Sequence, residues 1–270
     1  MRRKSAVLGL GLVVAFVLLA LAVPFLPLPE PDHVDTANRL KPPLTPGHLL
    51  GTDEFGRDIV SRLAWGSRPS LAAGVASALL AMGIGVPVGL LAGYLGGAVD
   101  HALMRAIDIL MAFPYILLAI ALVAAFGPGI RNATVALSIV GVPLYARLTR
   151  GAVLSIRVRE YVDAARVLGM GETRIMWRHV LPNAIPPVIV ATTLDVGFRI
   201  VATAGLSFLG LGVQPPTADW GSMLASGRNF VGLASHVATL PGIAILLVAL
   251  GFNLFGDGLR DVLDPTLRGV

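Results

Sequence analysis

The sequence predicts an all-α membrane protein with six transmembrane helices. Of its 270 residues, 55% are hydrophobic and 14% are charged, whereas about a quarter of the residues of a soluble domain carry charge. Six apolar segments have the character of helices that cross a hydrocarbon core of about 30 Å. None of them alternates apolar and polar residues as the strands of a membrane barrel do, so each is expected to be a helix.

The six spans are expected, in chain order, at residues 6–26, 70–94, 102–126, 133–146, 185–209 and 237–255. The first follows Arg2-Arg3-Lys4 and contains Ala20-Leu21-Ala22, which resembles a signal-peptidase site. Because this apolar run is long enough to cross the membrane, an uncleaved helix is favoured over a cleaved signal peptide. The fourth span is the shortest, and its ends are the least sharply marked.

Glycine and proline shape the later spans. Gly85, Gly89, Gly93 and Gly97 follow one another at intervals of four in and after the second span. This spacing leaves one helix face without side chains and predicts close packing against another helix. Prolines predict bends in the second, third and sixth spans, at Pro87, Pro114 and Pro241.

The arginine and lysine residues predict the orientation of the chain. With the amino terminus inside, twelve of them fall on inner segments and seven on outer ones, mostly in the long segment 27–69, which six acidic residues offset. A multi-pass protein of the cytoplasmic membrane with both termini in the cytoplasm is therefore expected. The arginines are scattered among loops instead of forming one patch, so nucleic acid is not an expected partner.

Two outer segments carry recognisable local patterns. Residues 59–67 could form an amphipathic helix lying on the membrane surface. The loop 214–230 predicts a turn at Pro215-Pro216 and then a short interfacial helix with Trp220 at the lipid boundary. Either segment could receive a substrate-delivering partner, and either could cap the outer mouth of the bundle.

The connector 160–183, between the fourth and fifth spans, is polar and helical in pattern. Its charged residues would be very costly inside lipid, so the connector lies outside the membrane; they include Asp163, Arg166, Glu172, Arg174 and Arg178. An amphipathic connector on the arginine-rich side of a membrane protein predicts a docking surface for a soluble partner.

One pair of opposite charges lies within a span. Asp195 and Arg199 are four residues apart, on one face of the fifth helix, where they can pair. Such a pair indicates either a polar residue set along a translocation path or a clamp to a neighbouring subunit. The sequence supports both interpretations equally.

No enzymatic or cofactor site is expected in this chain. The two lysines, Lys4 and Lys41, lie outside any Gly-Lys-Ser/Thr loop, so a phosphate-cradling P-loop is missing from the sequence. An intramembrane serine protease is disfavoured because Phe208 follows Ser207 where such enzymes need glycine. The five histidines lack the spacing of metal ligands, and there is no cysteine.

Several short motifs follow one another along nearly the whole chain. They are His48-Leu49-Leu50-Gly51-Thr52-Asp53 with Gly56-Arg57-Asp58; Asp163-Ala164-Ala165 with Gly169 and Leu181-Pro182-Asn183; Ser207-Phe208-Leu209-Gly210-Leu211-Gly212; Gln214-Pro215-Pro216; Trp220-Gly221; and Phe252-Asn253-Leu254 with Gly256-Asp257-Gly258-Leu259-Arg260-Asp261. Together they resemble the dipeptide/oligopeptide/nickel subfamily of ABC importer permeases, specifically its C-type subunit. Asp163 replaces the glutamate that is usual in the inner-loop motif, which keeps the charge and shortens its reach.

The resemblance implies a type I ABC importer permease fold. It implies an amino-terminal tail, first helix and outer loop at 1–68, a permease domain of five helices at 69–258 with a coupling loop at about 151–184, and a cytoplasmic tail at 259–270. It also implies that ATPase docking involves Asp163, Ala164, Ala165, Arg166 and Gly169.

The partners that the resemblance implies are a second homologous permease, one or two ABC ATPase subunits that bind ATP and Mg²⁺, and an extracytoplasmic solute-binding protein. The implied cargo is a peptide, with nickel, glutathione or oligosaccharide left open. The alternative function is a channel or secondary transporter that acts without an ATPase. Such transporters often contain two repeated halves, and no repeat is visible in this sequence.

Overall fold

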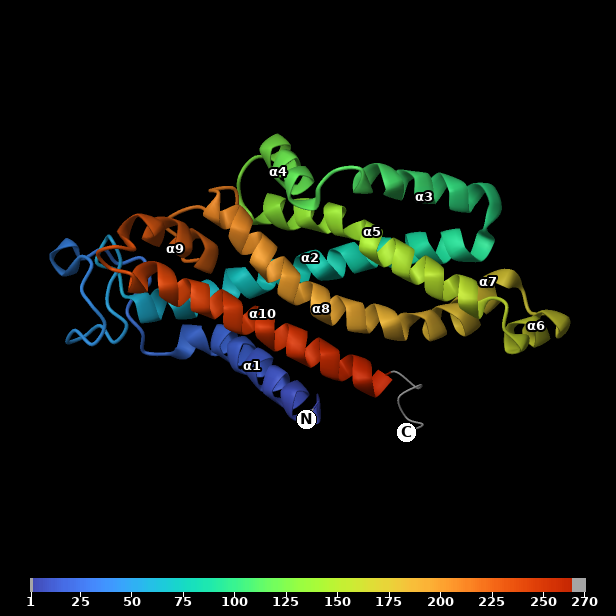
Figure 1. Cartoon of the computed structure of the whole chain (residues 1–270), viewed down its shortest axis with the longest axis horizontal. Coiled ribbons are helices and arrows are strands. Elements are labelled where there is room, and N and C mark those ends of the chain that lie inside the picture. Colours follow the sequence, from blue (N-terminus) through green and yellow to red (C-terminus); the bar gives the residue numbers. More distant parts are fainter. Residues whose placement is uncertain (1, 264–270) are drawn as a thin grey trace.

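The computed structural model describes residues 2–263 and is built almost entirely of helices (Figure 1). Within those residues the only extended pairings are two isolated bridges, Thr45–His48 and Thr52–Asp58. The longer helices are α1 (Arg2–Ala22), α2 (Ile59–Leu95), α3 (Gly97–Met111), α4 (Tyr115–Phe126), α5 (Ile130–Ile156), α8 (Leu181–Phe208) and α10 (His236–Leu263). The shorter elements are α6 (Glu160–Val167), α7 (Glu172–Ile175) and α9 (Trp220–Gly227), the 3-10 turns η1 (Val23–Phe25), η2 (Thr36–Asn38) and η4 (Arg228–Phe230), and the π-helical turn η3 (Met176–Val180).

Five helical stretches are long and apolar enough to cross a membrane, and the bent pair α3–α4 makes a sixth if it is counted as one span. The expected all-α membrane fold is therefore confirmed. The fourth span is longer than expected, because α5 covers 27 residues instead of 133–146. Its extension carries Arg147 and Arg150, which form ion pairs with Asp108 and Asp100 of α3.

The third expected span, 102–126, is not one straight helix. The axes of α3 and α4 differ by 89°, and Pro114 stands at the break in a non-helical conformation, with φ −56° and ψ 131°. Proline lacks the N–H that would continue the helix and disfavours a helical conformation in the residue before it. The bend expected at Pro114 is confirmed.

The second span begins at Ile59, eleven residues before the expected start, so the prediction of a separate surface helix at 59–67 was wrong. Asp58 caps α2, since its Oδ1 accepts a hydrogen bond from the backbone N–H of Ser61 at 2.9 Å. The first turns of α2 are covered by protein and not by lipid headgroups, because Ile59 is fully buried and Arg62 is only 4% exposed. The expected domain boundary between residues 68 and 69 falls inside this helix.

The glycine face of α2 packs directly against the backbone of α5. A Cβ atom on Gly85 would lie 2.5 Å from Cβ of Tyr145, and one on Gly89 would lie 2.3 Å from the carbonyl oxygen of Ala146. Gly93 meets the next turn of α5 in the same way, whereas Gly97 faces open space and begins α3. The predicted close packing is confirmed for three of the four glycines.

The connector and the outer segments lie at opposite ends of the molecule. Figure 1 shows α6 and α7 at one end of the long axis, and the loop 26–58 and α9 at the other. Helix α1 runs alongside α10, where a Cβ on Gly9 would lie 2.5 Å from the backbone nitrogen of Phe255. The core between these ends is apolar, and its buried members include Leu71, Val196, Ile200 and Val248.

Candidate functional site

The connector predicted at 160–183 folds into α6, a turn at Gly169, α7 and the π-helical turn η3, and then enters α8; it is called the α6–α7 connector. Helix α6 ends in a turn at Gly169, whose φ of +77° is a conformation that favours glycine. The N–H of Gly169 donates to the carbonyl of Arg166 at 2.9 Å, and the N–H of Met170 donates to that of Ala165 at 3.1 Å. These two bonds form a Schellman motif, which ends α6 sharply and sets the direction of α7.

The two faces of α6 have different environments. Val162 is fully buried and Ala165 is 6% exposed, and both pack into a cluster with Leu90, Val153 and Ile175. Asp163 and Ala164 are exposed on the other face. The alanine pair is therefore split, since Ala165 holds α6 against its own bundle and only Ala164 faces outward.

The tip of the connector exposes large apolar side chains. Val167 is 87% exposed and Leu168 is 84% exposed, at the end that lies farthest from α9. Exposed aliphatic residues on a fixed turn, beside charged neighbours, are typical of a surface that a protein partner covers.

A chain of polar contacts ties the connector to the end of α2. Arg166 pairs with Asp163 at 2.8 Å and with Glu172 at 3.2 Å. The other carboxylate oxygen of Glu172 accepts a hydrogen bond from the hydroxyl of Tyr94. Burial alone would lower the pKa of Arg166, but its contacts with Tyr94, Glu172 and Asp163 raise it, so this side chain stays protonated. Sequence reasoning missed the role of Tyr94, because a partner 78 residues away leaves no local pattern.

Asp195 and Arg199 form the ion pair expected from their spacing, at 2.5 Å between Arg199 Nε and Asp195 Oδ2. Arg199 is fully buried, and its Nη1 donates to the carbonyl oxygens of Ser77 in α2 at 3.2 Å and Leu137 in α5 at 2.8 Å. The hydroxyl of Tyr145 donates to Asp195 at 2.8 Å.

This ion pair thus joins three helices of a single chain. Arg199 also lies against Gly141 so closely that a Cβ there would be 1.7 Å from Nη2. The guanidinium is therefore enclosed by α2, α5 and α8 of its own chain. A place for Asp195 and Arg199 on the translocation path or at a contact between subunits stays a prediction.

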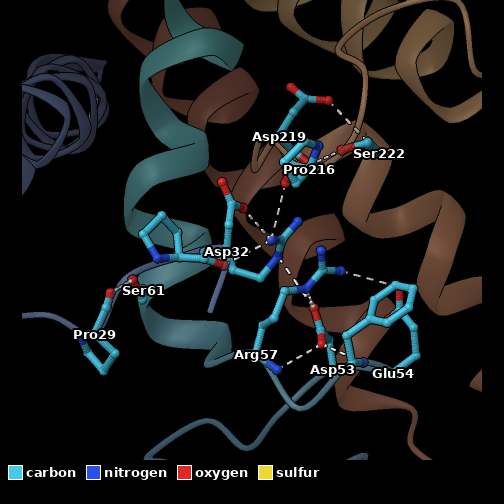
Figure 2. Close-up of polar contacts among 12 residues, drawn as sticks. Pro29, Asp32, Asp53, Glu54, Arg57, Ser61, Pro216, Asp219 and Ser222 are labelled. Carbon is cyan, nitrogen blue, oxygen red and sulfur yellow. Dashed lines mark hydrogen bonds and ion pairs between the residues drawn. The ribbon is translucent and has the colours of Figure 1, made fainter. Parts of the chain in front are cut away.

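At the opposite end, a second charge network orders the outer loop. Asp53 accepts hydrogen bonds from the backbone N–H groups of Phe55 and Arg57 and from Arg57 Nε at 2.6 Å (Figure 2). Arg62 of α2 donates to Asp32 at 3.0 Å and pairs with Asp53 at 3.4 Å. The outer-loop motif is thus a buried structural element that fixes the loop on the start of α2.

The loop after α8 is anchored to the same end of α2. The indole nitrogen of Trp220 donates to the carbonyl of Leu63 at 2.9 Å, and Asp219 accepts from the hydroxyl of Ser70 at 2.8 Å. Trp220 is fully buried, so the expectation that it lies at the lipid boundary was wrong. Pro216 and Asp219 lie beside the outer-loop network in Figure 2. Both outer segments therefore form one cap over the ends of α2, α8 and α10.

No metal site is formed by the described residues, since none of their histidine, aspartate and glutamate side chains gather in groups of three.

Two family models match the chain. The model for binding-protein-dependent transport system inner membrane components matches residues 85–269, which is more than half of the chain. The model for the N-terminal transmembrane domain of oligopeptide transport permease C matches residues 1–43.

Curated relatives match along almost the full length. The dipeptide transport system permease protein DppC of Alkalihalophilus pseudofirmus is 44% identical, over 99% of this chain and 88% of the relative. The di/tripeptide transport system permease protein DppC of Pseudomonas aeruginosa is 46% identical, over 98% of this chain and 89% of the relative. The glutathione transport system permease protein GsiD of Pectobacterium atrosepticum is 45% identical, over 98% and 89%.

A solved structure supports the fold. The inward-facing MetNI methionine ABC transporter contains a chain that superposes with a TM-score of 0.63 at 20% identity, covering 76% of this chain and 98% of that one. The chain therefore belongs to the family of binding-protein-dependent transport system inner membrane components, and it is a non-enzymatic permease subunit of an ABC importer of the dipeptide and oligopeptide type.

Proposed function

We propose that this chain imports peptides across the cytoplasmic membrane, together with a second permease, ATPase subunits and an external binding protein. ATP with Mg²⁺ binds to the ATPases, and both termini of this chain lie in the cytoplasm. The division at 1–68, 69–258 and 259–270 is part of this proposal as a division of the sequence, since its two boundaries lie inside α2 and α10; residues 264–270 lie outside the described residues.

The observation that carries the proposal is the exposed tip of the α6–α7 connector. Val167 and Leu168 present an apolar surface that the Schellman turn at Gly169 holds in place. Asp163, Ala164 and Arg166 lie on the same exposed side, so an ATPase groove that receives the tip also meets a carboxylate and a guanidinium. Ala165 and Val162 anchor the other side of α6, so force applied at the tip reaches the bundle.

The exposed surface of α3 and α4 supports a second permease as a partner. Its large apolar side chains lie on either side of the sharp bend at Pro114 and include Ile109, Phe113 and Leu117, which are 56–59% exposed. Residues 111–114, at the break, are exposed. Backbone groups that a helix break leaves unpaired are costly in lipid, so a partner helix fits this surface better than lipid does.

Peptide cargo follows from the relatives named for dipeptide and di/tripeptide transport. The glutathione relative is also named for a short peptide with free carboxylates. A dipeptide is therefore the first cargo to test.

Cross-linking tests the docking assignment. The chain has no cysteine, so Leu168→Cys introduces one thiol at the tip of the connector. In membranes that contain the co-expressed ATPases, a thiol-to-amine cross-linker is expected to join this thiol to an ATPase subunit. The control is Leu233→Cys, whose side chain is 79% exposed near α9 at the other end. Equal yields from both positions, or none from Leu168→Cys, would contradict the assignment.

Uptake into proteoliposomes tests the transport assignment. The purified complex with its binding protein is expected to accumulate labelled alanyl-alanine only when ATP is present on the ATPase side. Uptake by this chain alone, without ATPase and ATP, would instead support a channel or secondary transporter.

A further inference from the structure

An open cavity, which is a groove and not an enclosed space, lies between α5 and α8 next to the connector and has a volume of about 1010 Å³. Its walls come from the last turns of α5, the start of α6, the first turns of α8 and Arg260 of α10. The volume is at the upper end of the range of about 300–1,000 Å³ that is typical of small-molecule sites. The cavity therefore lies at the same end of the bundle as the connector.

The charged side chains that line this cavity are all arginines, namely Arg147, Arg159 and Arg260. Arg147 pairs with Asp108 at 2.6 Å, and both side chains remain half exposed. Arg159 and Arg260 form no ion pair with any residue between 2 and 263, and both are exposed. Two unpaired guanidinium groups beside one space attract an anion, and their planar fork suits a carboxylate.

The remaining wall is largely apolar. It includes Leu148, Ile156, Val190 and Leu194, together with the ring of Pro186. The cavity therefore offers separate environments for a charged group and for aliphatic side chains. A short peptide with a free carboxylate has both features.

The cavity also shares residues with the connector. Arg159 is the residue that precedes α6, and Tyr161 lies in the first turn of that helix. A movement of α6 would therefore shift Arg159 and Tyr161 relative to Val190 and Leu194 of α8. The same movement that an ATPase imposes on the connector would open or close the anion site.

We infer that this cavity is an inner vestibule that binds the carboxylate of the peptide through Arg159 and Arg260 before the peptide is released. The inference rests on the proposed function and adds a binding site and a chemical requirement to it. The site selects for peptides with a free C-terminal carboxylate, and movement of α6 weakens it when the ATPases change state.

Protection of a single thiol tests the inference. Ser155 lines the cavity and is exposed, and Ser155→Cys gives the only thiol in this chain. In the complete complex, alanyl-alanine at about ten times its dissociation constant is expected to slow maleimide labelling of this thiol by about tenfold, because only the unoccupied fraction of the complex reacts. Alanyl-alanine amide, which lacks the carboxylate, is expected to give no protection.

Two controls separate the site from indirect effects. Protection by alanyl-alanine is expected to disappear in the Arg159→Gln/Arg260→Gln background. Labelling of Leu233→Cys, near α9, is expected to be unaffected by either compound. Basal ATP hydrolysis and the gel-filtration profile show whether the variant complexes are intact.

Several outcomes would overturn the inference. Equal protection by the amide would show that the carboxylate is not recognised, and absence of protection at saturating peptide would show that the cavity does not hold cargo. Protection by phosphatidylglycerol but not by alanyl-alanine would assign the arginines to lipid headgroups. If the wild-type complex imports alanyl-alanine with ATP, these results reject the vestibule alone. If the wild-type complex imports no peptide, both the vestibule and the proposed function fail.

Discussion

The hydroxyl of Tyr94, in the last turn of α2, donates a hydrogen bond to the carboxylate of Glu172, the first residue of α7. Helix α2 is 37 residues long, and near its other end Arg62 is held by Asp32 and Asp53 of the outer loop. One helix thus connects the surface that we assign to ATPase docking with the cap at the opposite end. Its glycine face packs against α5 along the way, so displacement of α2 displaces α5 as well.

Tyr94→Phe is expected to weaken the coupling between ATP hydrolysis and uptake. The phenyl ring keeps the apolar contacts with Val153 and Ile156 and loses only the hydrogen bond to Glu172. A hydrogen bond to a charged group contributes about 1.5–3 kcal/mol, so we expect the number of peptides imported per ATP hydrolysed to fall by about tenfold. The measurement is uptake and ATP hydrolysis in the same proteoliposomes. Tyr115→Phe is the control, because the Tyr115 hydroxyl has no hydrogen-bond partner among the described residues; a similar fall in that variant would contradict a specific role for Tyr94.

Gly169→Pro is expected to abolish uptake while the protein still inserts in the membrane. Proline fixes φ near −65°, whereas Gly169 has φ +77° and donates its N–H to Arg166. The change removes this bond and redirects α7, but it touches no membrane-spanning packing. Gly171→Ala is a matched control, because Gly171 has φ −64° and a Cβ there meets nothing within 4 Å. Full uptake by Gly169→Pro would count against the docking assignment.

Gly89→Ala is expected to destabilise the bundle. A methyl group on Gly89 would lie 2.3 Å from the carbonyl of Ala146 and 2.8 Å from Cβ of Thr149, so α2 and α5 must separate. Overpacking of this kind costs about 1–3 kcal/mol. On the same helix, a Cβ added to Gly83 would meet nothing within 4 Å, and Gly83→Ala is expected to be neutral or slightly stabilising. Thermal unfolding in detergent would distinguish the two, and equal midpoints would refute the close-packed seam.

The sequence was sufficient to predict the membrane fold, because long apolar runs leave few alternatives to helices in lipid. It also indicated the connector, since a cluster of charges between two spans cannot lie in the bilayer. Tertiary contacts were not accessible in this way. The sequence alone predicts that Trp220 lies at the lipid boundary, but in the structure its indole donates a hydrogen bond to the carbonyl of Leu63. It also predicts a surface helix at 59–67, but in the structure Asp58 caps α2 and these residues form its first turns.

The pair of alanines in the connector shows the same limit at the site itself. Composition and spacing treat Ala164 and Ala165 alike, and only the direction in which α6 packs places Ala165 inside. The role of the cavity arginines also depends on tertiary structure, because Arg147, Arg159 and Arg260 come from three separate segments.

Asp195→Asn is expected to destabilise the chain more than removal of the whole ion pair does. Arg199 is fully buried, and without Asp195 its charge keeps only the carbonyl oxygens of Ser77 and Leu137 as partners. Breaking a buried pair by removing one member costs about 3–5 kcal/mol, whereas replacing both by apolar residues of similar size is often close to neutral. The unfolding midpoint of Asp195→Asn is therefore expected to fall well below that of Asp195→Leu/Arg199→Met.

Because the guanidinium of Arg199 is enclosed by helices of its own chain, we further expect the double variant to assemble with its partners and to import alanyl-alanine at a rate within about threefold of the wild type. Loss of cargo selectivity in a stable double variant would instead place Asp195 and Arg199 on the translocation path.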